Sequence, residues 1–151
     1  MAIQVGERAP EFNLKDHKGR EFQLSECKGK KVLLSFHPLA WTSVCAQQMQ
    51  ALEEHWDSFE ALITVVVGVS VDSVPCKKAW AETLGVNRVP LLSDFWPHGE
   101  VARSYGILRK EGFSERANII IGPDQKVAWV KVYPIRELPD VQEVLKVLKE
   151  G

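Results

Sequence analysis

The chain has 151 residues, of which 45% are hydrophobic and 26% are charged, and its formal net charge is −1. This length and composition exclude a disordered chain and predict one globular domain over residues 1–151, with enough apolar side chains for a core. The balanced charge gives no field that attracts nucleic acid or an anionic membrane, and no apolar run approaches the roughly 18 residues of a membrane span.

The first elements in chain order are a hairpin and a buried strand. Residues 12–24 alternate between apolar and polar side chains around Lys18-Gly19, a pattern typical of a β-hairpin. Residues 31–36 (KVLLSF) form a nearly continuous apolar run, which predicts a central strand buried on both faces. Apolar residues then recur at helical spacing, so we expect one helix from about residue 43 to residue 62. This core-facing stripe consists of Met49, Leu52, Trp56, Phe59 and Leu62.

The second half of the chain continues the alternation of strands and helices. We predict a strand at 63–72, a helix at 76–85 that ends at Gly85, a short strand at 89–94, a short helix at 98–107, a hairpin at 117–133 and an amphipathic helix at 138–150. Strands that alternate with helices and end in an antiparallel hairpin imply a mixed sheet. The predicted fold class is therefore α/β, a thioredoxin-like sandwich with a mixed central β-sheet, an N-terminal β-hairpin and flanking helices.

The three cysteines, at positions 27, 45 and 76, are an odd number and do not form a disulfide framework. No pair has CxxC spacing, no Cys/His cluster has the spacing of a zinc site, and no nucleotide or flavin motif is present, so we expect neither metal nor cofactor. The N-terminus lacks the pattern of a signal peptide, which favours a cytoplasmic protein. If these cysteines are reactive, their chemistry is that of free thiols.

Residues 36–45 read FHPLAWTSVC and lead from the first central strand into the next helix. Cys45 is therefore expected in the first helical turn, where unpaired backbone N–H groups and the helix dipole favour a thiolate. Thr42 stands where a CxxC protein has its other cysteine, which excludes a local disulfide and offers a hydroxyl as a hydrogen-bond donor. Pro38 shapes the loop and restricts water. The arrangement suits attack on a small electrophile, whereas a plain core role for Cys45 leaves Thr42 and Pro38 unexplained.

Pro38, Thr42 and Cys45 together spell Pro-x-x-x-Thr-x-x-Cys, which resembles the active-site signature of the peroxiredoxins. The phrases GERAPEFNL, GVSVD, LLSDFWPHG and RANIII extend the similarity over nearly the whole chain, and LLSDFWPHG resembles the alkyl hydroperoxide reductase E-like and bacterioferritin comigratory protein-like subfamilies. The resemblance implies a thiol-dependent peroxidase that reduces hydrogen peroxide and organic hydroperoxides through a sulfenic acid on the peroxidatic Cys45. It also implies a homodimer, and a thiol reductant such as thioredoxin or a low-molecular-weight thiol.

By the same resemblance, Arg116 is the guanidinium that lies against the thiolate. A cation beside the sulfur stabilises the thiolate, and its N–H fork can hold a peroxide oxygen. Without the resemblance, an arginine at the start of a strand is more often a solvated surface charge. The chain has Gln48 where many relatives carry an acidic residue three positions after the cysteine, so the surroundings of Arg116 are expected to differ here.

The roles of the other two cysteines stay open. Cys76 opens the helix after the second central strand, where some relatives place a resolving cysteine, but it lies about one turn earlier than usual. It is either the resolving cysteine or an incidental thiol, and a helix start would favour its thiolate. Cys27 lies in a polar turn and is predicted to be an exposed thiol. His37 is predicted to be a structural histidine rather than a general base.

Two other functions are compatible with the fold class alone. One is a thioredoxin-fold thiol-disulfide oxidoreductase acting on proteins, against which the missing CxxC argues. The other is a redox-inactive binding module, which does not account for the joint presence of Pro38, Thr42, Cys45 and Arg116. Peroxide consumption with dithiothreitol and reduction of insulin disulfides distinguish the three, since a binding module does neither.

Overall fold

The computed structural model describes all residues from Met1 to Gly151. Its central sheet has five strands in the order β5-β4-β3-β6-β7. The strands are β3 (Lys31–Phe36), β4 (Thr64–Ser70), β5 (Leu91–Ser93), β6 (Arg116–Ile121) and β7 (Val127–Tyr133). Strands β3, β4 and β5 run parallel, whereas β6 and β7 are each antiparallel to the preceding neighbour, so the predicted mixed sheet is confirmed.

A separate two-stranded hairpin precedes the sheet, as predicted. Strand β1 (Asn13–Lys15) pairs antiparallel with β2 (Glu21–Gln23). Asp16 closes the turn, because its Oδ1 accepts the N–H groups of Lys18 at 2.8 Å and Arg20 at 2.9 Å. Gly19 supplies the positive φ of 80° that this turn requires.

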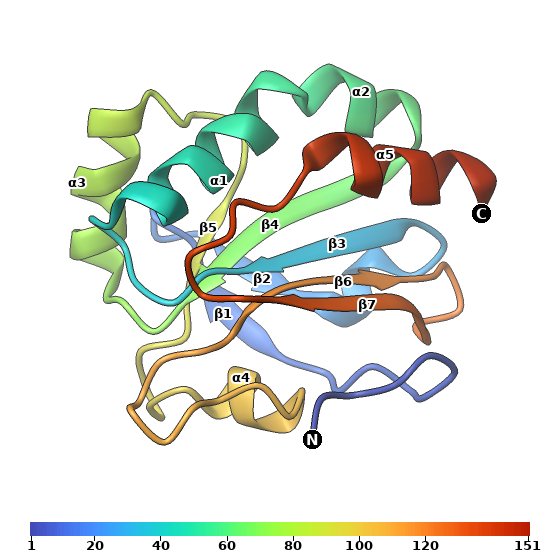
Figure 1. Ribbon diagram of the computed structural model, residues 1–151, viewed down its shortest axis with the longest axis horizontal. Helices are drawn as coiled ribbons and strands as arrows, with labels where there is room; N and C mark the ends of the chain where they lie inside the picture. The colour runs from blue at the N-terminus through green and yellow to red at the C-terminus, as the bar shows by residue number, and fades with distance from the viewer.

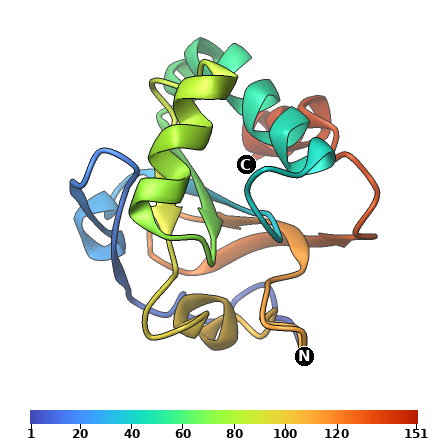
Figure 2. The ribbon, with the colours of Figure 1, turned by 90° about the vertical axis from the view of Figure 1, so that its left-hand side faces the viewer.

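Helices cover both faces of the sheet (Figure 1). One side carries α1 (Ser43–Glu54), α2 (Trp56–Ala61), α3 (Val74–Leu84) and α5 (Val141–Glu150). Figure 2 shows α4 (Glu100–Ser104) on the opposite side, near the N-terminal segment. These layers confirm the thioredoxin-like α/β sandwich. None of the helices is both long and apolar enough to cross a membrane.

Alternate residues of each central strand feed two separate cores. Leu33 and Ile120 point toward α1, α2, α3 and α5 and pack there with buried residues of those helices. Leu34 and Ile119 point to the other face, where α4 and the hairpin cover them. Each such side chain contributes roughly 1.5 to 3 kcal/mol by leaving water, so both faces hold the sheet in place.

One predicted helix is wrong in its extent. The region 43–62 forms two helices, α1 and α2, that are separated at His55. His55 has φ −101° and ψ 15°, outside the helical region, while its N–H, at 3.2 Å, and its ring Nδ1, at 2.9 Å, both lie within hydrogen-bond distance of the Ala51 carbonyl oxygen. Apolar spacing does not detect the break, because Leu52 and Phe59 are buried in the same core on either side of it.

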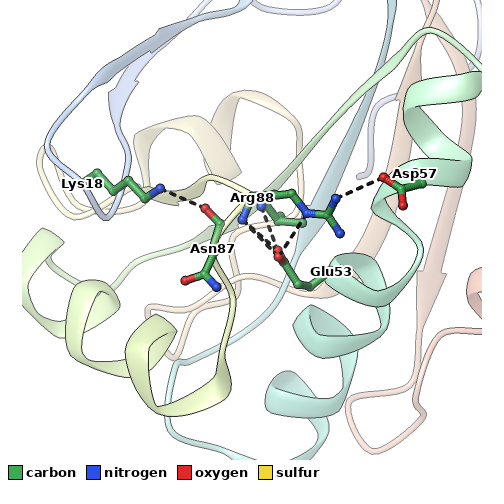
Figure 3. Close-up of polar contacts among 6 residues, drawn as sticks. Lys18, Glu53, Asp57, Asn87 and Arg88 are labelled. Carbon is green, nitrogen blue, oxygen red and sulfur yellow. Dashed lines mark hydrogen bonds and ion pairs between the residues drawn. The ribbon is translucent and has the colours of Figure 1, made fainter.

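Polar contacts fix the C-terminal half of α1 to the segment that leads into β5 (Figure 3). The Glu53 carboxylate accepts the backbone N–H groups of Arg88, at 3.0 and 3.1 Å, and of Val89, at 3.0 Å. The Arg88 guanidinium contacts the Asp57 carboxylate at 3.1 Å. The far end of α1 is thereby anchored, which sets the direction of the helix over the sheet.

Candidate active site

The loop between β3 and α1 places Cys45 beneath the surface. The chain leaves β3, passes Pro38, and enters α1 with Thr42 as the N-cap residue. Cys45 is the third residue of α1, as predicted, and it is 0% exposed. The backbone N–H groups of residues 43–45 donate to no backbone acceptor. The first turn therefore keeps free donors beside a buried thiol.

Arg116 lies against the Cys45 sulfur. It is the first residue of β6, which pairs with β3 so that Ala117 stands opposite Phe36 at the end of the strand. The guanidinium Nη1 donates to Cys45 Sγ at 3.2 Å, and Nε donates to the Ile135 carbonyl oxygen at 2.9 Å. Arg116 is 3% exposed, so water screens its charge little. The alternative interpretation of Arg116 as a solvated surface charge is wrong.

Gln48 bonds Arg116 from one turn farther along α1. Its Oε1 accepts from Arg116 Nη1 at 2.8 Å, while its Nε2 donates to Ser35 Oγ at 2.7 Å and to the Phe36 carbonyl oxygen at 3.3 Å. A carboxylate at this position would have no N–H for Ser35 and Phe36. Because Gln48 is neutral, no carboxylate at this position pairs with Arg116, whose Nη1 also donates to the Cys45 sulfur.

A cavity of about 260 Å³ opens beside Arg116. Pro38, Thr42 and Arg116 line it together with Leu39, Ser43, Val44, Phe113, Ile135 and Arg136. Thr42 Oγ1 donates to the Leu39 carbonyl oxygen at 2.7 Å, so in this conformation Thr42 offers an acceptor rather than the predicted donor. The structure thus brings three predicted site residues to one opening, and Arg116 links that opening to the Cys45 sulfur.

Cys76 is the third residue of α3, which begins two residues earlier than predicted because Ser73 caps it. The Cys76 thiol donates to Asp72 Oδ1 at 3.8 Å. Burial, and then the Asp72 carboxylate, raise the pKa of the Cys76 thiol, while the Trp41 side chain acts in the opposite direction. The expectation that the helix start favours a Cys76 thiolate is therefore wrong in this conformation.

Cys27 is buried, contrary to the prediction of an exposed thiol. It closes a short 3-10 helix, η1 (Leu24–Cys27), and is 9% exposed. Together with Leu24 it packs into the core on the α4 side of the sheet. Burial raises the pKa of the Cys27 thiol. Its neighbours Glu26 and Lys28 are polar and exposed, so the sequence pattern around Cys27 does not indicate that Cys27 is buried.

A buried cation that the sequence patterns did not single out lies on α3. Lys77 is 0% exposed; its Nζ donates to Ser70 Oγ and lies 3.1 Å from His37 Nε2. Burial lowers the pKa of Lys77 to about 7. His37 is also 0% exposed, and burial followed by Lys77 holds its pKa well below the usual value, as befits a structural histidine. Helical spacing was the available signal, since Lys77 precedes the buried Trp80 and Ala81 by three and four residues.

Comparison with known proteins identifies relatives over most of the chain. The AhpC/TSA family matches residues 5–130. Alkyl hydroperoxide reductase E of Mycobacterium tuberculosis is 37% identical over 121 residues, which cover 79% of this chain and 78% of that protein. A peroxiredoxin of Thermoplasma volcanium is 34% identical over 155 residues, which cover 99% of this chain and 75% of that protein.

A solved structure shares the fold as well as the sequence. The crystal structure of the reduced 2-Cys peroxiredoxin of Plasmodium vivax matches with a TM-score of 0.89 and 29% identity, covering 97% of this chain and 81% of that one. The resemblance carried by the Pro38, Thr42 and Cys45 signature is confirmed by these matches. The chain therefore belongs to the AhpC/TSA family and is a peroxiredoxin, a thiol-dependent peroxidase.

Proposed function

We propose that Cys45 is the peroxidatic cysteine and that it reacts as a thiolate with hydrogen peroxide and organic hydroperoxides. The hydrogen bond of 3.2 Å from Arg116 Nη1 to Cys45 Sγ is the observation that carries this proposal. The sulfur attacks one peroxide oxygen and the O–O bond breaks, so that two electrons pass from sulfur to the peroxide. Cys45 becomes a sulfenic acid, and the released hydroxide or alkoxide takes up one proton.

The groups around the cavity are suited to hold the peroxide. Arg116 Nη2 has no partner in the protein and is available to the oxygen that gains charge as the O–O bond breaks. The free N–H groups of residues 43–45 add donors from the helix start. Thr42 Oγ1 can accept the peroxide O–H, which orients the substrate, and Pro38 forms part of the wall.

Single-turnover kinetics test this assignment. Reduced protein is mixed with less than one equivalent of hydrogen peroxide, and residual peroxide is followed together with free thiol. We expect rapid consumption that Cys45→Ser abolishes and that Cys27→Ser leaves unchanged. Peroxide consumption by Cys45→Ser at the wild-type rate would refute the assignment. Insulin reduction without peroxide consumption would instead support the thiol-disulfide oxidoreductase.

The step that returns the sulfenic acid to the thiol has two possible routes. Cys76 attacks Cys45 and forms a disulfide, or an external thiol attacks Cys45 directly. Cys45 and Cys76 pack on the same side of the sheet, but the contact with Asp72 keeps Cys76 as a thiol, which favours the external reductant. The intact mass of the protein after one equivalent of peroxide distinguishes the two routes. A product about 2 Da lighter indicates a disulfide. A sulfenic acid on Cys45 that dimedone traps equally in the wild type and in Cys76→Ser indicates direct attack by an external thiol.

We further infer that the reductant is thioredoxin or a low-molecular-weight thiol. Residues 1–151 act as one domain, because both hydrophobic cores share a single sheet. All three cysteines are free, as suits a reducing cytoplasm. Exposed aromatic side chains, Trp41, Phe95 and Trp96, favour a homodimer. Sedimentation of the reduced protein tests the dimer, and turnover with each reductant tests the partner.

A further inference from the structure

The loop that shapes the active site has one backbone anchor outside itself. Among residues 38–42, only Ala40 makes a backbone hydrogen bond to a distant part of the fold, and its N–H donates to Asp72 Oδ2 at 2.8 Å. Trp41, the next residue, has a φ of 68° and is 54% exposed. A residue other than glycine adopts this left-handed backbone conformation only when its surroundings enforce it. The backbone hydrogen bond that ties this loop to a distant part of the fold therefore goes to Asp72.

Asp72 is itself held firmly. Its backbone carbonyl oxygen accepts from Ser93 Oγ at 2.6 Å, and its Oδ2 also accepts from Ser70 Oγ at 2.6 Å. Ser70 Oγ in turn accepts from Nζ of the buried Lys77. These contacts come from β4, β5 and α3, so the carboxylate is fixed by the sheet and not by the loop that it holds.

The remaining oxygen of the same carboxylate faces the second thiol. Asp72 Oδ1 accepts from Cys76 Sγ at 3.8 Å, and the negative charge opposes ionisation of that thiol. One side chain thus contacts both the loop next to Cys45 and the sulfur of Cys76.

We propose that Asp72 is a positioning residue for the peroxide reaction, which holds the loop 38–42 in its reactive shape through Ala40 and, with its other oxygen, keeps Cys76 unreactive. The inference rests on the proposed role of Cys45. Asp72 contacts neither substrate nor the reacting sulfur, so its effect on the rate passes through the loop that carries Pro38 and Thr42.

Three substitutions at this position separate the two contacts. Asp72→Asn keeps an oxygen for the Ala40 N–H but loses the charge beside Cys76. Asp72→Ala loses both contacts, and Asp72→Glu keeps the charge but displaces it by one methylene. Ser73→Ala is the matched control for the two loop readouts, because it removes the bond from the Cys76 N–H to Ser73 Oγ, which caps α3, and leaves the contact of Asp72 with Ala40 in place.

Three readouts are measured on each reduced protein. They are the second-order rate constant with hydrogen peroxide, hydrogen exchange at the Ala40 amide, and alkylation of Cys76 by iodoacetamide at pH 8, quantified on its peptide. With Asp72→Ala we expect the peroxide rate constant to fall by about tenfold or more and Ala40 to exchange at least about tenfold faster, as for loss of one charge-assisted hydrogen bond. Asp72→Asn should restore both values to within about threefold of the wild type. Cys76 should react about tenfold faster in both variants because the charge that opposes its ionisation is gone. Ser73→Ala should leave the peroxide rate constant and the exchange of Ala40 near the wild type.

Several outcomes overturn the proposal. It is wrong if Asp72→Asn slows the peroxide reaction as much as Asp72→Ala does, or if Ala40 loses protection while the rate is unchanged, in which case Cys45 keeps its proposed role. Unchanged Cys76 alkylation in Asp72→Asn also overturns it. If Asp72→Ala does not fold, Asp72→Glu replaces it and must slow the reaction. A wild type that does not consume peroxide refutes the proposed role of Cys45 instead. The hydrogen exchange of Ala40 and the alkylation of Cys76 then still test the two contacts of Asp72.

Discussion

Replacing Lys77 by Met should change how the stability of this protein depends on pH. Lys77 is completely buried, and burial lowers its pKa from 10.5 to about 7. That change corresponds to about 5 kcal/mol of free energy against the protonated side chain in the folded state. Between pH 7 and pH 10.5 the unfolded chain binds the proton that the folded chain releases, so the wild type becomes more stable as the pH rises through this window. From pH 7 to pH 9 the gain amounts to about 2 kcal/mol.

Lys77→Met removes this titration and also removes the bonds to Ser70 and His37. For the neutral amine the loss of these bonds is the same at every pH in this range, because the pH dependence is already contained in the titration of Lys77. The free energy of unfolding is measured in guanidinium chloride at pH 7, 8 and 9, with a reductant present. We expect the wild-type value minus the variant value to rise by about 2 kcal/mol from pH 7 to pH 9. Thiols of the unfolded chain titrate in both proteins and cancel in the difference. A difference that stays constant within about 0.5 kcal/mol would refute the buried, titrating lysine.

Three further predictions concern the site and its support. Arg116→Gln should slow the single-turnover peroxide reaction by about a hundredfold, because a donor aimed at the departing oxygen is lost, and an unchanged rate would contradict this. Thr42→Val should slow the same reaction by about tenfold while Thr42→Ser restores it, since only the hydroxyl oxygen is needed; equal rates for the two variants would argue against the acceptor role. Burial alone would raise the pKa of Glu53, but the backbone N–H donors of Val89 and Arg88 outweigh burial and lower that pKa. Glu53 therefore stabilises the fold above about pH 4.5, and this stability is lost as the pH falls through the folded-state pKa. Glu53→Gln should therefore lower the free energy of unfolding by about 1 to 2 kcal/mol at pH 7, with the difference vanishing at lower pH in acid titrations monitored by circular dichroism.

The elements that bury a regular apolar pattern were predictable from the sequence. The continuous runs at 31–36 and 63–72 became β3 and β4, and Gly85 ends α3 in the left-handed conformation, as its position indicated. The break at His55 was not predictable from periodicity, because the apolar stripe continues across it, with Leu52 and Phe59 buried in the same core.

The site was predictable in part, for a reason of distance along the chain. Cys45 and Thr42 lie within one loop and helix start, so local rules place them. Arg116 is 71 residues away from Cys45, and the antiparallel pairing of β6 with β3 brings it next to the Cys45 sulfur. The resemblance to the family predicted this contact, whereas residue spacing could not. Asp72 follows a strand like many surface acids. Its contact with Ala40 spans 32 residues and appears only when β3 and β4 pair, whereas its contact with Cys76, four residues away, forms at the start of α3.

The most direct test of Cys45 as the peroxidatic cysteine is mass spectrometry of Cys76→Ser protein after one equivalent of hydrogen peroxide in the presence of dimedone. With Cys76 absent, no internal disulfide can consume the sulfenic acid, so the dimedone adduct should lie on the Cys45 peptide in nearly all molecules and Cys27 should stay unmodified. An adduct on Cys27, or peroxide consumption that leaves Cys45 as a free thiol, would contradict the account.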